Sequence, residues 1–142
     1  MSTSSVTKKS VSTEAAYAAI QAATAKAAKM GIGVCVSVVD SSAIEVAFLR
    51  MNNAFIPSLD IAKNKAYTSA GFGFPTMQWD DVLKGNTQLQ AGVVTQPRII
   101  TFGGGLPIYD GEELIGAIGV SGGSEEEDVL CAQAGLDSIF KG

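Results

Sequence analysis

The fold of this chain is decided by the stretch Phe102-Gly103-Gly104-Gly105-Leu106-Pro107-Ile108-Tyr109-Asp110-Gly111, followed by Ile115-Gly116-Ala117-Ile118-Gly119-Val120-Ser121-Gly122-Gly123-Ser124-Glu125. Two apolar runs flank the dipeptide Asp110-Gly111, which is typical of a type I′ turn between antiparallel strands. Ser124, with Glu127 three residues later, is a capping box that begins a helix. The stretch therefore predicts a hairpin over 106–109 and 112–120 that runs into a C-terminal helix.

The upstream part of the chain alternates helices and strands in the same way. An Ala-rich stretch that begins after Ser12 or Thr13 and stops before Gly31 predicts a helix. In order, we expect a helix over 14–30, strands over 33–39 and 44–50, a helix over 58–69 ended by Gly71 and Gly73, a short helix over 75–83, a loop over 84–96 and a strand entry over 98–102. Helices around an antiparallel sheet of about five strands predict an α+β domain.

The length and composition of the chain narrow its class. The 142 residues fit one domain, which we expect over 12–142 after a flexible, Ser/Thr-rich N-terminus over 1–11. Hydrophobic residues make up 46%, which is ample for a core. A net charge of −4 disfavours nucleic-acid and anionic membrane surfaces as partners. Because the start of the chain lacks the apolar core of a secretory signal, we expect a cytoplasmic protein.

The chain contains no histidine, and this absence excludes several kinds of site. A Ser-His-Asp triad, a Cys-His pair, a histidine metal site and the usual proximal haem ligand are all ruled out. The two cysteines, Cys35 and Cys131, are far apart in sequence and are expected to be buried as small hydrophobic side chains. We therefore expect no metal site.

Several segments carry a family likeness. They are Val38-Val39-Asp40, Phe48–Asn52, Ala54-Phe55, Asp60–Ala66, Arg98-Ile99-Ile100, Phe102–Pro107 and Ile115–Gly123. In these segments the chain resembles the GlcG/HbpS-like family, also described as the haem-degrading-type domain, which includes the C-terminal domain of PduO-type proteins. The nearest likeness is to the OrfY-type proteins encoded with glycerol- and diol-dehydratase genes. The likeness covers about residues 11–139.

The resemblance implies a profilin-like α/β/α fold, homo-oligomers, and binding of a small molecule or a tetrapyrrole, with haem and cobalamin both known in the family. The chain departs from the family pattern at Ser42-Ala43, where glycines are usual, and in having no histidine. A bound haem iron would therefore need another ligand. The other possible ligands are Met51, Met77, Tyr109, Cys35 or a lysine.

Two basic residues are the best charged candidates for a binding site. Arg50 ends a predicted strand and Lys65 lies in a predicted helix, and both could converge on a carboxylate or phosphate. The alternative is that they form salt bridges to Asp40, Glu45 or Asp60. Lys65 as a catalytic base would need a pKa lowered by burial.

Two glycine-rich turns are further candidates. Phe102 and Gly103–Gly105 could let a ligand approach the backbone closely, or they could form a bend between strands. Ser121, Gly122 and Gly123 precede a helix N-terminus, where free N–H groups bind anions. The acidic residues 125–128 that follow favour a capping role there instead.

An aromatic cluster is expected from Tyr67, Phe72, Phe74 and Trp79, which lie close together in sequence between two predicted helices. Such a cluster forms a pocket for a planar ligand, part of the core or a subunit contact. The sequence leaves these three interpretations open.

Three functions follow from these features. The first is a small-molecule- or tetrapyrrole-binding accessory protein of a glycerol- or diol-type catabolic pathway. The second is a cofactor-free enzyme for a small carbonyl or hydroxy acid, with Lys65 or Asp40 as acid/base and Arg50 as the carboxylate clamp. The third is an oligomeric interaction module that supports a dehydratase or its reactivating factor through apolar surface at Phe55, Ile56 and Phe72.

Overall fold

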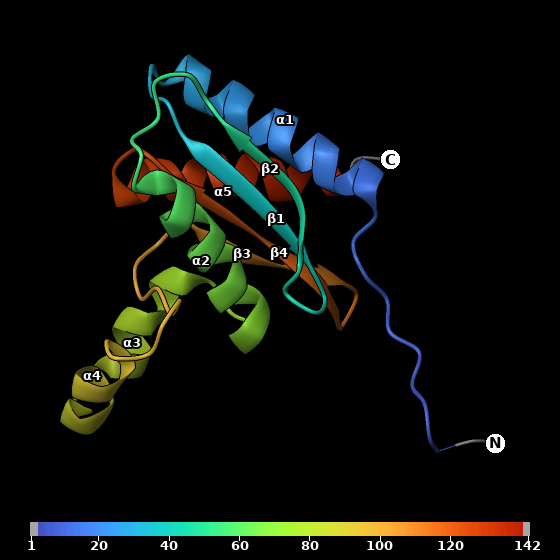
Figure 1. The fold of residues 1–142 in the computed structure, drawn as a ribbon, viewed down its shortest axis with the longest axis vertical. Helices are drawn as coiled ribbons and strands as arrows, with labels where there is room; N and C mark the ends of the chain where they lie inside the picture. Colours follow the sequence, from blue (N-terminus) through green and yellow to red (C-terminus); the bar gives the residue numbers. More distant parts are fainter. Residues whose placement is uncertain (1–2, 141–142) are drawn as a thin grey trace.

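The computed structural model describes residues 3–140 and shows one antiparallel sheet between two helical layers (Figure 1). The sheet has four strands in the order β2-β1-β4-β3. Their bounds are Cys35–Asp40 for β1, Glu45–Arg50 for β2, Gly105–Asp110 for β3 and Glu113–Ser121 for β4. The two hairpins, β1–β2 and β3–β4, join through the antiparallel pairing of β1 with β4.

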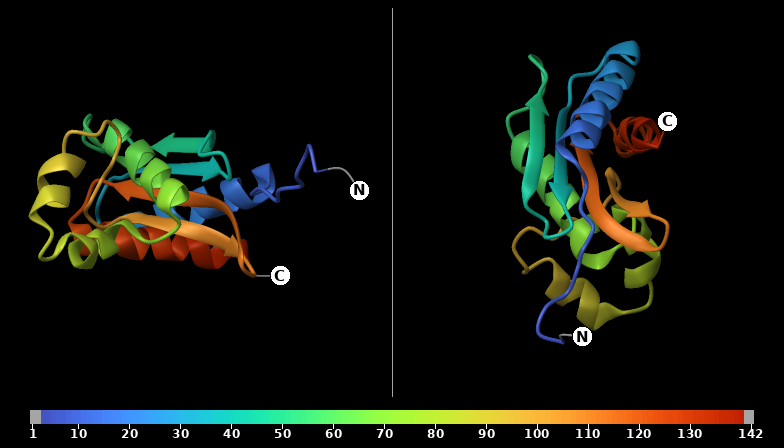
Figure 2. Two further views of the ribbon diagram at one scale, coloured as in Figure 1. Left: turned by 90° about the horizontal axis from the view of Figure 1, so that it is seen from below. Right: turned by 90° about the vertical axis from the view of Figure 1, so that its right-hand side faces the viewer.

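Helices α1 (Thr13–Lys29) and α5 (Glu125–Ile139) lie side by side on one face of the sheet (Figure 2). Alternate side chains of the central strands, such as Val36, Val38 and Ile118, point into this layer and form the main core. The buried side of α1 consists of alanines and Ile20, which lets α1 and α5 pack closely. This face holds most of the apolar burial.

Helix α2 (Ser58–Phe72) covers the opposite face of the sheet, above β1 and β4. Its contact residues are small, with Ala62 and Ala66 fully buried. A Cβ at Gly119 of β4 would collide with the carbonyl oxygen of Ala62, so the strand needs glycine at this position for α2 to lie so close. The glycine pattern of β4 therefore sets the distance between helix and sheet.

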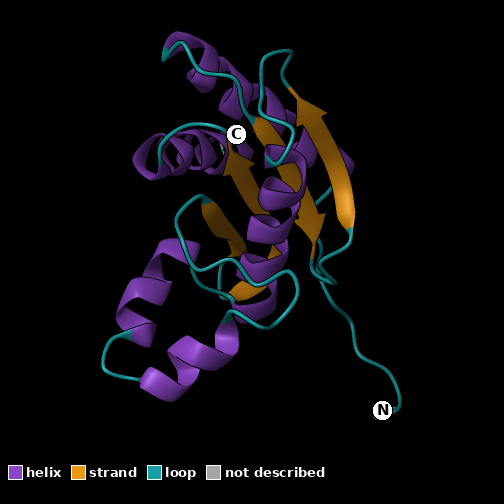
Figure 3. Cartoon of the chain, turned by 60° about the vertical axis from the view of Figure 1, so that its left-hand side comes forward, coloured by secondary structure: helices purple, strands orange, loops and turns teal. Residues whose placement is uncertain are grey.

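A helical arm, residues 76–97, projects beyond the sheet (Figures 1 and 3). It consists of a 3-10 turn (Thr76–Gln78), α3 (Trp79–Leu83) and α4 (Thr87–Val93). Asn86 caps α4, because its side chain accepts a hydrogen bond from Leu89 N at 3.0 Å. The chain then returns through residues 98–104 to the edge strand β3.

The α+β class and the antiparallel sheet with helices on both faces are confirmed, and several details of the prediction are wrong. The sheet has four strands rather than about five, because 98–102 is not a strand: Arg98 has a φ of 72°, which breaks an extended run. The predicted loop over 84–96 contains α4. Helix α2 continues through Gly71 to Phe72, and Gly73, whose φ is 79°, caps its C-terminus.

The segment before α1 runs along the end of the second hairpin. Val11 is buried, and its N–H donates to Ile115 O at 2.9 Å. The backbone N–H of Lys9 donates to the Glu113 carboxylate, and Ser10 Oγ accepts from Ser41 N. These contacts join residues 9–11 of the expected flexible N-terminus to the sheet. Residues 1, 2, 141 and 142 of the expected ranges lie outside the described residues.

No helix in the described part of the chain is long and apolar enough to cross a membrane.

Candidate functional site

An aromatic cavity of about 540 Å³ lies between the end of α2 and the helical arm. This volume falls within the range of about 300–1,000 Å³ that is usual for small-molecule sites. The lining is mostly apolar and comes from four segments of the chain. It consists of Phe72, Phe74, Trp79, Val82, Gln88, Leu89, Gly92, Val93, Thr95, Gln96 and Ile99.

Three aromatic rings form one wall of this aromatic cavity. Phe72 meets Trp79 edge to face, with ring centroids 5.0 Å apart, and Phe74 lies 5.2 Å from Trp79. Trp79 is buried, and within residues 3–140 its Nε1 is the one buried side-chain nitrogen or oxygen without a hydrogen-bond partner. An unpaired buried donor costs about 1–3 kcal/mol. The wall therefore contains a polar atom that the protein itself leaves unsatisfied.

A second cavity of about 370 Å³ adjoins the aromatic cavity and shares Phe72, Gln96 and Ile99 with it. Its other lining residues are Tyr67, Thr68, Gly71 and Pro97. Tyr67 therefore belongs to this second cavity rather than to the three-ring wall. The guanidinium of Arg98 lies over the Tyr67 ring, 3.9 Å from its centroid.

Lys65 is the most deeply buried charged residue of the candidate set, with an exposed fraction of 1%. Its Nζ donates to Asp128 Oδ2 at 3.0 Å and to Val120 O at 2.8 Å, and it lies 5.1 Å from the centre of the Phe102 ring. Burial lowers the pKa of Lys65, and the nearby carboxylates of Asp128 and Glu125 oppose that shift. Burial likewise raises the pKa of Asp128, opposed by Lys65 and by backbone N–H groups. The salt-bridge partner of Lys65 is thus Asp128, not Asp40, Glu45 or Asp60.

The glycines of residues 103–105 pack against the protein itself. A Cβ at Gly104, where φ is 128°, would lie 2.6 Å from both Lys65 Nζ and Val120 O. A Cβ at Gly105 would lie 2.6 Å from Lys65 O, and Gly103 N donates to Glu125 Oε1 at 2.9 Å. The absence of side chains at these glycines therefore lets Lys65 and α5 lie close to the backbone of residues 103–105.

The turn before α5 follows the capping alternative. Ser124 and Glu127 form both hydrogen bonds of the capping box. Gly123 N donates to Asp128 Oδ1 at 2.8 Å, so the anion at this helix N-terminus is a carboxylate of the same helix. Ser121 Oγ is buried and donates to Ser58 Oγ. Each glycine-rich turn therefore donates a backbone N–H to a carboxylate of α5, Gly103 to Glu125 and Gly123 to Asp128.

Arg50 and Asp40 lie at opposite ends of the sheet. Arg50 pairs with Cys35 at the start of β1, and Asp40 ends the same strand five residues later, about 16 Å away. Asp40 Oδ1 accepts from Ser42 N and Ile44 N in the hairpin turn. Arg50 is exposed, whereas Lys65 is enclosed. The three residues do not meet in one cluster.

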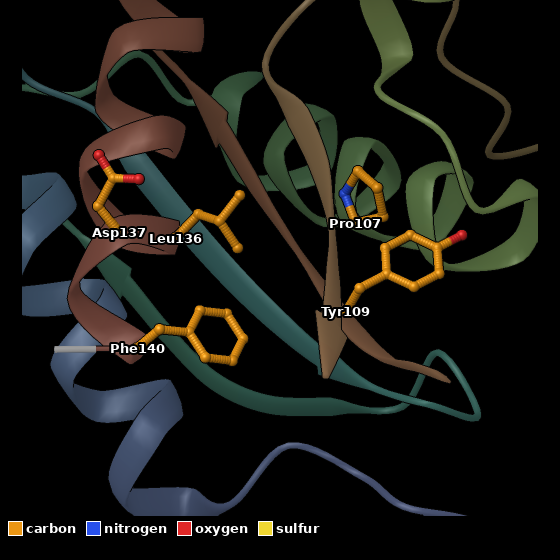
Figure 4. A pocket seen from close by; sticks show the side chains of 5 residues that line it. All are labelled: Pro107, Tyr109, Leu136, Asp137 and Phe140. Carbon is orange, nitrogen blue, oxygen red and sulfur yellow. The ribbon is translucent and has the colours of Figure 1, made fainter. Parts of the chain in front are cut away.

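A third hollow of about 410 Å³ lies between the edge strand β3 and the end of α5 (Figure 4). Leu136 and Asp137 of α5, with Phe140 directly after the helix, line one side of it, and Pro107 and Tyr109 of β3 line the other. Tyr109 OH is already used, since it donates to Gly73 O at 2.7 Å. The hollow therefore offers an apolar surface with one carboxylate.

The side chains that could ligate iron are outside the aromatic cavity, as its lining contains no Met, Cys, Tyr or Lys. Cys35 and Cys131 are fully buried free thiols, and burial raises the pKa of Cys131 to about 11. Met51 Sδ accepts a hydrogen bond from Val34 N. Met77 is half exposed beside Glu125 and Val129, at another surface. The aromatic cavity is lined mainly by apolar side chains and contains none of the side chains that usually ligate haem iron.

The sequence interpretation missed the part of the aromatic cavity that α4 contributes. Leu89 and Val93 are one helical turn apart, and they follow Asn86, which is a suitable N-cap residue. This spacing and this cap were the available signal for an amphipathic helix. Ile99 and Arg98 carried no such signal, because they lie in an irregular segment.

Comparison with known proteins identifies relatives over most of the chain. The model of the family described as haem degrading protein HbpS-like matches residues 11–137. An uncharacterised 15.0 kDa protein from the dhaT-dhaS intergenic region of Citrobacter freundii is 42% identical over 118 residues, covering 82% of this chain and 83% of the relative. The corrinoid adenosyltransferase PduO of Salmonella typhimurium is 34% identical over 86% of this chain. The match spans 37% of the length of PduO.

Two solved structures share the fold closely. The Klebsiella pneumoniae protein ORFY has a TM-score of 0.92 and 34% identity, covering 99% of this chain and 98% of its own. A PduOC:haem complex has a TM-score of 0.86 and 31% identity, covering 94% of this chain and 97% of its own. These likenesses confirm the family predicted from the motifs.

Proposed function

This chain belongs to the HbpS-like family of haem-degrading-type proteins, and from that premise we propose that it binds a tetrapyrrole, or a similar planar and largely apolar molecule, in the aromatic cavity. The observation that carries the proposal is the three-ring wall of Phe72, Phe74 and Trp79, which belongs to a cavity large enough for a small molecule. Planar ligands stack on such rings, and apolar ligands gain from the burial of surface.

The chemistry of the cavity lining sets how a tetrapyrrole would be held. Because no lining side chain is an iron ligand, apolar contacts with the ring supply the affinity rather than coordination of a central metal. An acceptor on the ligand, or a rearrangement of the wall that supplies one, would also satisfy the Trp79 indole N–H. A metal-free porphyrin should therefore bind about as tightly as haemin.

The chain carries its own reporter for this test, since Trp79 is the only tryptophan and lines the cavity. The purified protein would be titrated in parallel with haemin, metal-free protoporphyrin IX and cobalamin, with tryptophan fluorescence and the visible spectrum recorded. We expect quenching that saturates at a fixed stoichiometry for both porphyrins. A response that never saturates with any of the three compounds would refute tetrapyrrole binding.

A pair of variants in α4 locates the site. A Cβ at Gly92 meets open space and Gly92 lines the cavity, so we expect Gly92→Leu to place its side chain at the cavity and to weaken porphyrin binding at least about tenfold. Ala91→Leu adds the same side chain at the neighbouring exposed position, which is not part of the lining. Equal affinities of the two variants would place the ligand elsewhere.

An accessory role in glycerol or diol catabolism is the finer proposal. The Citrobacter relative from the dhaT-dhaS intergenic region and the PduO relative support it. We expect the protein to be retained by a purified glycerol or diol dehydratase, or by its reactivating factor, in a pull-down experiment. Absence of retention with every one of these proteins, with and without porphyrin, would remove this finer role and leave ligand binding intact.

An interaction module is the second candidate, favoured by the turn before α2. Phe55 and Ile56 are 68% and 83% exposed and adjacent, which is unusual for large apolar side chains. If this turn joins copies of the chain into a homo-oligomer, Phe55→Ser/Ile56→Ser should lower the mass measured by light scattering. Ile44→Ser, an exposed apolar residue in the first hairpin turn, is the control.

A further inference from the structure

Arg98 has a backbone conformation that few residues of its type adopt. It is one of two non-glycine residues among 3–140 with a positive φ, at 72°; the other, Ala43, lies in a hairpin turn. Buried Thr68 holds the backbone on both sides, since its Oγ1 donates to Arg98 O at 2.9 Å and accepts from Ile100 N at 3.0 Å. Strained residues of this kind persist where the surroundings hold them, and they cluster at binding sites.

The side chain of Arg98 is oriented as firmly as its backbone. Its guanidinium stacks on Tyr67 at 3.9 Å, and its Nε donates to Asn64 Oδ1 at 2.9 Å. Both contacts leave the two terminal nitrogens available, because no acidic side chain of residues 3–140 forms a salt bridge with them. An exposed, stacked and unpaired guanidinium is suited to bidentate recognition of a carboxylate.

The position of Arg98 connects it to the cavities. Its neighbours Pro97 and Ile99 both line the second cavity, as does the Tyr67 ring beneath its guanidinium. That cavity shares Phe72, Gln96 and Ile99 with the aromatic cavity. A ligand whose ring lay in the aromatic cavity could therefore extend an acidic substituent along this shared wall toward Arg98.

We propose that Arg98, held on Tyr67 at the rim of the second cavity, is the recognition point for a carboxylate of the ligand whose ring occupies the aromatic cavity. The identity of that ring as a tetrapyrrole rests on the proposed function above. The anion site itself rests on the geometry of Arg98, Tyr67 and Asn64. It makes the pair of cavities selective for planar acids over planar neutral molecules of the same size.

The test compares an acid with its ester. Protoporphyrin IX and its dimethyl ester would be titrated into the wild-type protein and into Arg98→Asn, with Trp79 fluorescence as the readout. Asparagine tolerates a positive φ, so this variant removes the guanidinium without forcing the backbone to change. We expect the wild type to prefer the acid by about three- to tenfold, as suits an ion pair at an exposed rim. In Arg98→Asn that preference should disappear while the affinity for the ester stays the same.

The outcomes separate this inference from the function on which it rests. If Arg98→Asn keeps the preference of the wild type for the acid, or if the wild type shows none, the Arg98 site is refuted and porphyrin binding stands. If the wild type binds neither porphyrin, the proposed function falls. Naphthalene-2-carboxylate and its carboxamide then replace the porphyrins in the same two proteins. The anion site is supported if the wild type prefers the carboxylate and Arg98→Asn does not. Any other result overturns it.

Discussion

Two regions of the molecule contain glycines in opposite environments, one tightly packed and the other open. In the glycine seam, which we define as Gly104, Gly105 and Gly119 with the Lys65–Asp128 pair, missing side chains are replaced by other parts of the protein, and an added Cβ would collide. In the helical arm, a Cβ at Gly92 meets open space, and the wall around Trp79 leaves a buried N–H unpaired. The seam is filled, and the arm is open.

The difference teaches that a conspicuous motif and a binding site need not coincide. The seam joins the two helical layers, because Lys65 of α2 reaches past Gly104 to Asp128 of α5. Because this packing is tight, a larger side chain at any glycine of the seam would collide with its neighbours. The arm and the end of α2 together line open cavities that the protein does not fill, although the sequence of the arm contains no recognisable motif. Ligand binding requires unfilled space, so the less constrained region is the better candidate.

The largest expected effect comes from breaking the ion pair of the seam. Lys65→Met leaves the Asp128 carboxylate buried without its cation, and we expect the free energy of unfolding to fall by about 3–5 kcal/mol. Chemical denaturation measures this directly. Lys65→Met/Asp128→Asn should recover part of the loss, because asparagine is neutral and still accepts from Gly123 N. A loss below about 1 kcal/mol in Lys65→Met, no more than an exposed pair contributes, would contradict the account of the seam.

The next effect compares one glycine from each region. Gly104→Ala places a Cβ 2.6 Å from Lys65 Nζ at a φ of 128°, and should lower the free energy of unfolding by about 1–3 kcal/mol. Gly92→Ala should instead leave it unchanged or raise it slightly, since alanine is the better helix former and its Cβ has room. Thermal and denaturant unfolding of the two variants gives the comparison. Changes of the same sign would erase the distinction between the two regions.

The smallest effect concerns the two helix caps. Ser124→Ala removes the capping box that starts α5 beside the seam, and should lower the free energy of unfolding by about 1 kcal/mol. Asn86→Ala removes the cap of α4 in the arm, where we expect faster amide hydrogen exchange within 87–93 and little change in global stability. Exchange followed by mass spectrometry distinguishes the two. An arm cap that lowered global stability as much as Ser124→Ala would show that the arm unfolds together with the sheet.

Local signals in the sequence predicted most of the fold. The second hairpin, the Ser124–Glu127 capping box and the alternating strands each depend on residues a few positions apart, and the structure has all of them. The turn of that hairpin is displaced by one residue from the prediction: Asp110 pairs with Glu113, the two loop residues are Gly111 and Glu112, and only Gly111 has a positive φ, so the turn is not type I′. The failures have local causes as well. Arg98 takes a positive φ in what reads as a strand entry, and α4 is short and weakly patterned. In both places surrounding contacts outweigh local preference.

The sequence by itself determined which segments become helices and strands, how the hairpins turn and which family the chain resembles, because backbone hydrogen bonding and capping act over a few residues. Only the tertiary structure decided that Lys65 pairs with Asp128, 63 positions away. It also decided that other parts of the protein, rather than a ligand, occupy the space beside the glycines of the seam. It likewise brought Phe72, Leu89 and Ile99 to one cavity, and Arg98 to the ring of Tyr67, which lines the adjoining cavity. Such pairings depend on how whole elements dock, and docking is set by the shape and burial of surfaces that no short stretch of sequence contains.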